Sequence, residues 1–412
     1  MSEATPKLRF PGFDQPWKPA HAGDAFRSSR ARGRDGLPIY SVTLDRGLVP
    51  RASLDRHLAA DAADEQNLRA QPGDLVYNTM RMWQGAVGRA EVECMVSPAY
   101  VVLSPKKGVS SAFFDYWFQH PRMRHLLGAY SHGLTSDRLR LYPDDFAQIP
   151  LSLPGPSEQE RIASAIKSAD RKIALLREEQ DALEAYKAGL LDRLFSRKVR
   201  FRRDDGTDFP DWRPARFGSV LSFVRTNSLS RERLSDAGEI ANIHYGDIHR
   251  HLPLLIRRDR EQFSYLQAND AEGLLEVDFC RPGDLIIADA SEDLADIGKT
   301  VEIIQTGRRD LVAGLHTMLA RPLDGVFALG FAGHMMATTA VRRQIHRLAQ
   351  GVSVYGLSRS NVAGLTIELP CSEEQEKIAA VLGALEGNIA STSLLIERAD
   401  DFRRGLIRGL YP

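Results

Sequence analysis

Two stretches, "PGPSEQERIASAI" (residues 154–166) and "PCSEEQEKIAAVL" (residues 370–382), are nearly the same phrase at two places in one chain. Residues 151–195 align with residues 367–411 without a gap, and 12 of these 45 positions are identical. A repeat of this kind indicates that one structural unit is used more than once. The sequence therefore predicts two similar halves in tandem.

Each copy of the repeat begins with residues that start helices. Ser157 with Glu160 fits a capping box, and Ser372 with Gln375 fits the same motif in the second copy. Apolar residues then recur at alternating spacings of four and three, which is typical of a coiled coil. The helix-pairing residues predicted from this pattern are Ile162, Ile166, Ile173, Leu176, Leu183, Leu190, Leu194, Ile378, Leu382, Leu385, Ile389, Ile396, Leu406 and Leu410.

We expect these two helices to pair with each other in antiparallel orientation. The alternative is an ordinary amphipathic helix that packs only on its own domain. Gly189 and Gly405 stand at matching positions of the two copies, where glycine is unfavourable in a helix. Their recurrence suggests a close approach of two helices or a bend near the helix end.

The segments between the helices also match each other. "QPGDLVYNTMRMWQGAVGRA" (71–90) aligns with "RPGDLIIADASEDLADIGKT" (281–300) without a gap. In both, "PGD" predicts a tight turn that leads into a buried strand. The residues that flank the loop keep the same spacing in both segments, whereas residues 79–86 and 289–296 differ almost completely. We therefore predict a mixed α/β fold, with two tandem globular domains (1–150 and 198–366), two long antiparallel coiled-coil helices (151–197 and 367–412) and a pseudo-twofold internal repeat.

The composition bounds the class of protein. The chain has 412 residues, of which 43% are hydrophobic and 26% charged, and its formal net charge is zero. This counts against a protein whose whole surface binds nucleic acid, although it leaves room for a local basic groove. The three cysteines have no metal-binding spacing, and His244, His249, His316 and His334 form no set of metal ligands. The segment "MSEATPKLRF" has no apolar signal-peptide core. "GVFALGFAGHMMATTAV" (325–341) is the most apolar stretch, and we read it as one buried helix of a cytoplasmic protein.

With these features together, the sequence resembles the specificity subunit of a Type I restriction–modification system. The resemblance covers essentially the whole chain. It rests on the two "LP…EQ.[RK]IA" helix openings, on "PKLRFPGFDQPW" (6–17), on "IYSVTLDRGLVP" (39–50) and on "GDLVYN" (73–78). The ordered set in two halves is more specific than any one of its pieces.

The resemblance implies two target-recognition domains that bind a two-part DNA sequence around a non-specific gap. It also implies two modification subunits, which carry S-adenosylmethionine and methylate adenine at N6. Restriction subunits, which use ATP and Mg²⁺, would join that complex. The chain itself would perform no chemistry and hold no cofactor or metal. In agreement, the sequence contains no GxGxxG, Walker A, HExxH or GxSxG motif.

DNA reading requires side chains that reach base edges. In the first domain the candidates are polar residues of the strand at 39–43, of the loop after residue 77 and of "HGLTSDRLR". Arginine pairs well with guanine, and asparagine or glutamine with adenine. These candidates are Ser41, Thr43, Asn78, Arg81, Gln84, Thr135, Ser136, Arg138 and Arg140.

In the second domain the candidates lie in "NIHYGDIHRH" and "GVSVYGLSRSN" and at the end of the matched segment. They are His244, Tyr245, His249, Lys299, Ser353, Tyr355, Ser358 and Arg359. The loop "DASEDLAD" (289–296) differs, because its acids would repel phosphates. Either one of them accepts a hydrogen bond from cytosine N4, or the loop faces away from DNA; we expect the second.

Two other function classes stay open at this point. A non-catalytic adaptor would use the paired helices to join proteins and would not bind DNA, which the zero net charge favours slightly. An enzyme with a divergent site would show turnover by the isolated chain. Salt-dependent DNA binding by the complex would separate a DNA reader from an adaptor.

Overall fold

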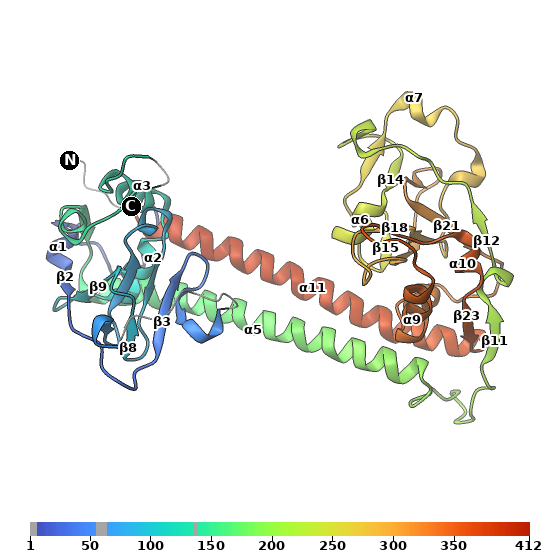
Figure 1. Cartoon of the computed structure of the whole chain (residues 1–412), viewed down its shortest axis with the longest axis horizontal. Helices are drawn as coiled ribbons and strands as arrows, with labels where there is room; N and C mark the ends of the chain where they lie inside the picture. The colour runs from blue at the N-terminus through green and yellow to red at the C-terminus, as the bar shows by residue number, and fades with distance from the viewer. Residues whose placement is uncertain (1–5, 55–63, 136–137) are drawn as a thin grey trace. The chain divides into compact units, whose positions relative to one another are not determined.

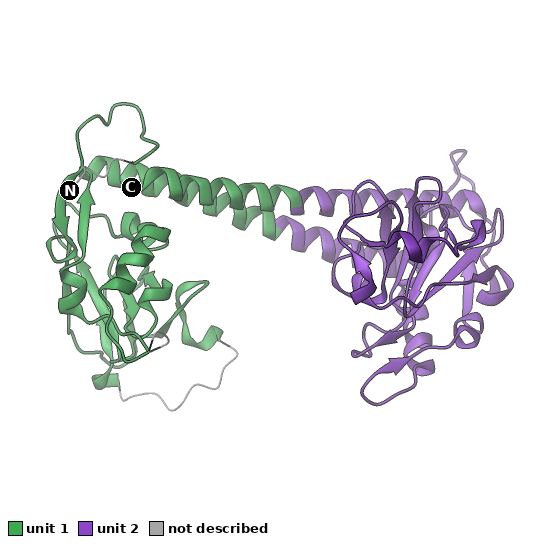
Figure 2. Cartoon of the chain, turned by 90° about the horizontal axis from the view of Figure 1, so that it is seen from above, with its two compact units in different colours: residues 1–178, 394–412 green, residues 179–393 purple. Residues whose placement is uncertain are grey.

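The computed structural model of the chain describes residues 6–54, 64–135 and 138–412. The chain forms two compact units (Figure 2). Unit 1 comprises residues 1–178 and 394–412, and unit 2 comprises residues 179–393. Each unit is a mixed α/β body, so the predicted fold class is confirmed at that level.

Unit 1 contains most of the first half of the chain (Figure 1). Its elements are β1 (Lys18–His21), α1 (Ala22–Ala25), β2 (Phe26–Ser29), β3 (Ile39–Thr43), β4 (Gly47–Pro50), η1 (Arg51–Ser53), η2 (Asp64–Gln66), β5 (Leu68–Ala70), β6 (Leu75–Asn78), η3 (Met82–Gln84), β7 (Val87–Arg89), β8 (Cys94–Val96), β9 (Tyr100–Pro105), α2 (Ser111–Trp117), α3 (Pro121–Ala129), α4 (Pro143–Ala147), β10 (Pro150–Leu153) and the first part of α5 (Pro156–Phe195).

Unit 2 repeats this plan with additions. Its elements, besides the end of α5, are β11 (Arg213–Arg216), η4 (Phe217–Ser219), β12 (Leu221–Val224), η5 (Arg231–Arg233), β13 (Leu234–Ser235), β14 (Ala241–Ile243), α6 (Tyr245–Arg250), β15 (Leu255–Arg257), β16 (Ser264–Leu266), α7 (Ala268–Ala271), η6 (Glu276–Asp278), β17 (Leu285–Ala288), β18 (Ala290–Ser291), β19 (Thr300–Gln305), β20 (Leu311–Ala313), β21 (Thr317–Pro322), α8 (Phe331–Met336), α9 (Thr339–Leu348), β22 (Tyr355–Gly356), α10 (Arg359–Ala363), β23 (Thr366–Leu369) and the first part of α11 (Ser372–Leu410).

The main sheets of the two units have the same strand order. In unit 1 the order is β2-β9-β6-β7, and in unit 2 it is β12-β21-β17-β19, with β15 added at the edge. A second sheet in each unit contains one parallel pair, β3 with β8 or β14 with β20. Equivalent strands therefore occupy equivalent places, as the aligned sequence segments predict.

The "PGD" turns place the central strand of each main sheet. Gly73 and Gly283 have φ values of +93° and +90°, a left-handed conformation that suits glycine. The next residue closes the turn twice. In unit 1 the Asp74 N–H donates to the Gln71 carbonyl, and the Asp74 carboxylate accepts from the Gln71 N–H at 2.8 Å. In unit 2 Asp284 and Arg281 exchange the same two bonds, and the carboxylate bond is again 2.8 Å. The sequence interpretation of "PGD" as a structural turn is correct.

The strands that follow these turns are buried on both faces. In β6, Leu75 and Tyr77 pack in one core with α2 and α5, whereas Val76 faces a second core between the two sheets. In β17, Leu285 and Ile286 divide between two cores in the same way. Alternate residues of a strand point to opposite faces, so a run of apolar residues is required here. The sheet thus carries each unit's two cores.

The apolar stretch 325–341 forms two helices, so the expectation of one buried helix is wrong. α8 ends at Met336, and α9 begins at Thr339 after a short break. The Thr338 side chain accepts a hydrogen bond from the Val341 N–H, which caps α9. The capping threonine therefore divides the apolar stretch into two helices, where the apolar pattern alone had indicated one.

The two long helices begin differently from the predicted capping boxes. α5 begins at Pro156, so Ser157 lies inside its first turn and caps nothing, and α11 begins at Ser372 itself. The glutamines serve another purpose. Gln159 accepts from the Ser110 N–H and donates to the Pro154 carbonyl, and Gln375 accepts from the Ala328 N–H and donates to the Pro370 carbonyl. The repeated phrase therefore ties each helix start to its own unit.

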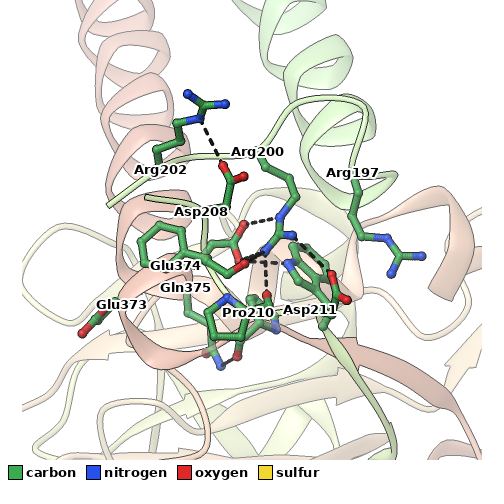
Figure 3. Close-up of polar contacts among 12 residues, drawn as sticks. Arg197, Arg200, Arg202, Asp208, Pro210, Asp211, Glu373, Glu374 and Gln375 are labelled. Carbon is green, nitrogen blue, oxygen red and sulfur yellow. Dashed lines mark hydrogen bonds and ion pairs between the residues drawn. The ribbon is translucent and has the colours of Figure 1, made fainter. Parts of the chain in front are cut away.

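The glutamates of the phrase bind the segments that enter each unit. Glu158 accepts two hydrogen bonds from Arg9, at 2.9 and 2.8 Å, and Glu374 accepts two from Arg200, at 3.1 and 2.8 Å (Figure 3). Such bidentate pairs are strong and directional. Each bond raises the pKa of its arginine, since the neighbouring carboxylate favours the charged guanidinium. The first glutamate of each "EQE" run thus binds the arginine of "KLRF" or "KVRF", so these two sequence matches form the same contact in both units.

The entry segments also lie against the ends of the long helices. In unit 1 the Leu8 N–H donates to the Gly409 carbonyl at 2.8 Å. In unit 2 the Val199 N–H donates to the Arg193 carbonyl at 3.1 Å, at the matching position of the repeat. Each unit is therefore built from one globular half, the start of one long helix and the end of the other.

Side chains of α5 and α11 meet within each unit. In unit 1, Asp170 binds Arg403. In unit 2, Gln180 binds Ser393 at 3.0 Å and Lys187 binds Glu386 at 2.9 Å. Residue numbers rise along α5 as they fall along α11, so the paired stretches run antiparallel. All fourteen predicted helix-pairing residues are buried or half-buried.

Among the described residues, α11 is long and apolar enough, by length and composition, to cross a membrane. The same helix carries the charged Glu386 and Arg403, both paired with α5, and buries Ile378, Leu382 and Leu410 in the two units. These contacts are those of a helix packed in a protein. The length and composition of a membrane span are therefore met by α11, whereas the sequence pattern pointed to residues 325–341 as the most apolar stretch.

Gly189 and Gly405 do not mark a close approach, because a Cβ atom built at either position would meet nothing within 4 Å. We expect Gly189→Ala to stabilise the protein by about 0.5–1 kcal/mol, since alanine restricts the unfolded chain and favours the helix. Chemical unfolding of the two proteins would measure this. Gly218→Ala is the matched opposite, because its Cβ would lie 2.6 Å from that of Ala363 and should destabilise unit 2. A destabilising Gly189→Ala would contradict the open surroundings of this residue.

Glu302 predicts a pH-dependent stability of unit 2. Its carboxylate is buried, accepts from the N–H groups of Gly330 and Gly333 at 2.6 Å, and burial raises its pKa from 4.5 to about 7. Between these values the folded state binds more protons than the unfolded state, so this contribution to stability falls as pH rises from about 4.5 to 7. The unfolding free energy of wild type minus that of Glu302→Gln should decline over this range. A flat difference would contradict the raised pKa.

Candidate nucleic-acid interface

Three segments of unit 1 meet at the end of β6. The Leu141 N–H donates to the Thr79 carbonyl at 3.0 Å, and the Thr79 hydroxyl donates to the Ala99 carbonyl at 3.2 Å. These bonds join the loop that follows β6, the turn that precedes β9 and the segment 131–141. We call this arrangement the three-segment frame of unit 1.

Unit 2 has the same frame at the end of β17. The Leu357 N–H donates to the Asp289 carbonyl at 2.9 Å, and the Asp289 N–H donates to the His316 carbonyl at 3.0 Å. The frame joins the loop that follows β17, the turn between β20 and β21 and the segment 350–357. Its side chains differ from those in unit 1, because Asp289 stands where unit 1 has Thr79. The bond to the turn also differs, because it comes from the Thr79 hydroxyl in unit 1 and from the Asp289 backbone N–H in unit 2. The two units thus present different residues on a similar arrangement of three segments.

The frame of unit 1 carries exposed cations. Arg81 is the residue just before η3, and its side chain makes no hydrogen bond or ion pair within the described residues. Arg138 and Arg140 are exposed on the segment 131–141. Arg124 from α3 lies beside the same loop, because a Cβ at Gly85 would be 3.2 Å from its Nε atom. Exposed guanidinium groups can bind guanine edges or phosphates. Arg124 could not be selected from residue pattern alone, since only the packing of α3 brings it to the loop.

Other candidates of unit 1 are committed to the fold. Ser41 is only 8% exposed. The Thr43 hydroxyl donates to the Gly47 carbonyl within the β3–β4 turn, and Asn78 Oδ1 accepts from the Met80 N–H. Gln84 Oε1 is buried without a partner in the described part of the chain. Thr135 is exposed on the frame, and Ser136 lies outside the described residues.

In unit 2, α6 brings several candidates to the frame. His244 is 6% exposed, and its Nδ1 accepts from the Gly246 N–H at the start of α6. Burial and the nearby Arg231 lower the pKa of His244, which favours the neutral ring. The Tyr245 ring lies 5.8 Å from that of His249 and 5.3 Å from that of His316. His244 therefore supports α6, whereas the Tyr245 ring contacts residues of the frame.

His249 and Lys299 connect α6 to the strands. His249 Nε2 is 3.0 Å from the Ala290 carbonyl, and the Lys299 ammonium donates to the His249 carbonyl at 3.3 Å. Lys299 is half-buried, so it is less free to bind a phosphate than the sequence suggests.

The segment 350–359 supplies the last candidates. Ser353 and Arg359 are exposed, while the Ser358 hydroxyl accepts from the Asn361 N–H and caps α10. Tyr355 lies in β22, opposite Ser291 of β18. This pairing places the acidic loop 289–296 beside Tyr355, so the loop lies next to another candidate. The expectation that the loop faces away from DNA stays a prediction. Strand pairing between distant segments cannot be read from either segment alone.

Asp284 belongs to the fold, as expected. It is buried and forms a salt bridge of 2.7 Å with Arg321, whose pKa it raises. Within the described residues no group of three or more His, Cys, Asp or Glu side chains is placed to hold a metal ion.

Comparison with known proteins shows what the chain is similar to. Residues 19–185 match the family model described as "Type I restriction modification DNA specificity domain". The chain is 26% identical over 187 residues to the Type I restriction enzyme MjaIX specificity subunit of Methanocaldococcus jannaschii. Residues 19–185 of this chain are thus similar to the DNA specificity domain of Type I restriction–modification systems. The alignment spans 43% of this chain and 43% of that relative.

Solved structures show a likeness of fold over the whole chain. The S subunit of a Type I restriction–modification system from M. genitalium is 12% identical, with a TM-score of 0.59, and the match covers 99% of each chain. A chain from a study of complex assembly and conformational transition of the type I R-M system is 15% identical, with a TM-score of 0.54 over 98% of each chain. At these identities the likeness concerns the fold alone.

The matched region includes β6 and the segments that meet at its end. The equivalent frames at the ends of β6 and β17 carry different side chains in the two units. We therefore treat them as the candidate nucleic-acid interface.

Proposed function

We propose that the chain reads a two-part DNA site, with one half of the site bound by each three-segment frame. The observation that carries this proposal is the equivalent frame with exchanged side chains, Thr79 and Ala99 in unit 1 against Asp289 and His316 in unit 2. A duplicated scaffold keeps the geometry of approach to DNA, and changed side chains alter the bases that are accepted. A protein-only adaptor gives no reason for variation to concentrate there.

The long helices would act as an antiparallel coiled coil that joins two target-recognition domains, proposed as residues 1–150 and 198–366, through helical regions 151–197 and 367–412. Support comes from the antiparallel contacts between α5 and α11 in each unit. A helix of 40 residues spans about 60 Å, against about 34–36 Å for one turn of B-DNA. This length suits two half-sites with a gap between them, and the internal repeat suits pseudo-twofold symmetry.

The outer surfaces of the helices would bind two modification subunits. In unit 1, Leu394, Leu395 and Phe402 are exposed, with Phe402 63% exposed, and a groove of about 420 Å³ lies between Ala165–Lys172 and Leu395–Phe402. Exposed apolar surface on a helix is typical of partner binding. The modification subunits would supply S-adenosylmethionine and methylate adenine at N6, and restriction subunits would supply the ATP- and Mg²⁺-dependent reactions. This chain would hold no cofactor and catalyse nothing itself.

The test is co-expression with the methyltransferase of the same system in a methylation-free host, followed by long-read mapping of N6-methyladenine. A two-part motif with an unspecified gap is the expected result. Replacing residues 1–150 by those of a related subunit should then change one half of the motif only. A continuous motif would overturn the two-unit proposal, and a stable complex without methylation would favour the adaptor.

A further inference from the structure

The backbone of His316 has an unusual conformation. Its φ is +54°, in the left-handed region, which is uncommon for a residue other than glycine. The residue stands in the turn between β20 and β21, and its carbonyl receives the Asp289 N–H of the three-segment frame. Strained conformations of this kind concentrate at functional sites. The turn therefore fixes a ring at the frame at some energetic cost.

The His316 side chain is held from two directions. Its Nδ1 lies 3.2 Å from Asp289 Oδ1, and its ring lies 5.3 Å from the Tyr245 ring in an edge-to-face arrangement. The side chains of His316 and Asp289 are nevertheless 50% and 31% exposed. Neither His316 Nε2 nor Asp289 Oδ2 has a hydrogen-bond partner among the described residues. The pair thus presents a fixed acceptor with unused capacity.

The charge of this loop argues for a base contact. Asp289 is followed by the exposed acids Glu292 and Asp293, and a carboxylate repels phosphate groups. A carboxylate can instead accept a hydrogen bond from the amino group of cytosine in the major groove. In unit 1 the matching residue is the neutral Thr79, whose hydroxyl is used within the frame. The carboxylate is therefore a feature of unit 2 alone.

We propose that Asp289 reads one cytosine in the half-site of unit 2 by accepting a hydrogen bond from its N4 amino group, and that His316 is the positioning residue for this carboxylate. The inference rests on the proposed function, because it concerns the half-site that unit 2 would bind. The sequence left open that one acid of the loop 289–296 accepts from cytosine; the structure points to Asp289 among them and adds His316, which the sequence did not single out.

The experiment compares N6-methyladenine motifs made by the complete complex with wild-type chain and with Asp289→Asn, His316→Gly and Glu292→Gln variants. Asparagine pairs with adenine, so Asp289→Asn should lose about tenfold discrimination at one cytosine of the second half-site and admit adenine there. His316→Gly tolerates the left-handed backbone but lacks the ring, and should relax the same position. Glu292→Gln removes a neighbouring exposed charge and should leave the motif unchanged.

The first half of the motif serves as an internal control for folding and assembly. If the wild type methylates a two-part motif and both Asp289→Asn and His316→Gly keep it unaltered, the inference is overturned while the proposed function stands. Relaxation by Glu292→Gln to the same extent would also overturn it, since loss of charge alone would then explain the effect. If the wild type methylates no two-part site, the proposed function itself fails.

Discussion

Glu374→Ala is expected to lower the free energy of unfolding of unit 2 by about 3–5 kcal/mol, because it removes one partner of a buried ion pair. The Glu374 side chain is 1% exposed and accepts hydrogen bonds from Arg200 and, at 3.0 Å, from the indole N–H of Trp212. Without the carboxylate, the buried indole would lose its partner, and the half-buried guanidinium would keep only the Phe209 and Pro210 carbonyls and the exposed Asp211. Chemical unfolding followed by tryptophan fluorescence would measure the change.

Glu373→Ala is the matched control, since Glu373 is the preceding residue, is 65% exposed and pairs with Arg203 at the surface. A pair of this kind contributes about 1 kcal/mol or less. Glu158→Ala tests the same contact in unit 1, where Trp17 Nε1 has no partner within the described residues and Arg9 would keep its hydrogen bond to the Gln15 carbonyl. Equal effects of Glu374→Ala and Glu373→Ala would show that burial of the ion pair does not matter.

Leu183→Pro is the second change with a large expected effect. Proline in a helix interior removes a backbone hydrogen bond and clashes with the preceding turn, at a cost of about 3 kcal/mol or more. Leu183 is half-buried within α5, three residues after Gln180 and four before Lys187, which both contact α11. We expect loss of helical circular dichroism and loss of co-purification with the methyltransferase.

Leu183→Ala separates the helix from the side chain, because alanine keeps the backbone and removes only the half-buried apolar group. It should retain the helical signal and weaken assembly less than proline does. If Leu183→Pro assembled normally and methylated the same two-part motif, a continuous α5 would be unnecessary for the proposed function.

Local patterns predict the parts of this fold that depend on local chemistry. The "PGD" turns follow from proline, glycine and aspartate at fixed positions, and the helix ladder follows from apolar spacing. The capping boxes failed for a tertiary reason. Serine and glutamate at the right spacing were present, but Gln159 and Glu158 are held by Ser110 and Arg9, which are far away in the sequence. A long-range contact decided the helix start.

The candidate site shows the same division. Exposed cations such as Arg81 and Arg138 could be selected from residue type and loop position. His316 and Arg124 could not, because one depends on a backbone conformation and the other on the packing of α3. The placement of the acidic loop depended on pairing between β18 and β22, which lie more than 60 residues apart. Only the alignment of residues 71–90 with 281–300 indicated that the loops after β6 and β17 occupy equivalent places.

The bond between Leu8 and Gly409 has a consequence for the order of the chain. In unit 2 the matching partners, Val199 and Arg193, are joined by a short continuous connection, whereas in unit 1 they come from opposite regions of the sequence. The contact therefore does not require its two partners to be neighbours in the chain. A chain cut between Ser196 and Lys198 should for this reason keep the bond between Val199 and Arg193 in unit 2.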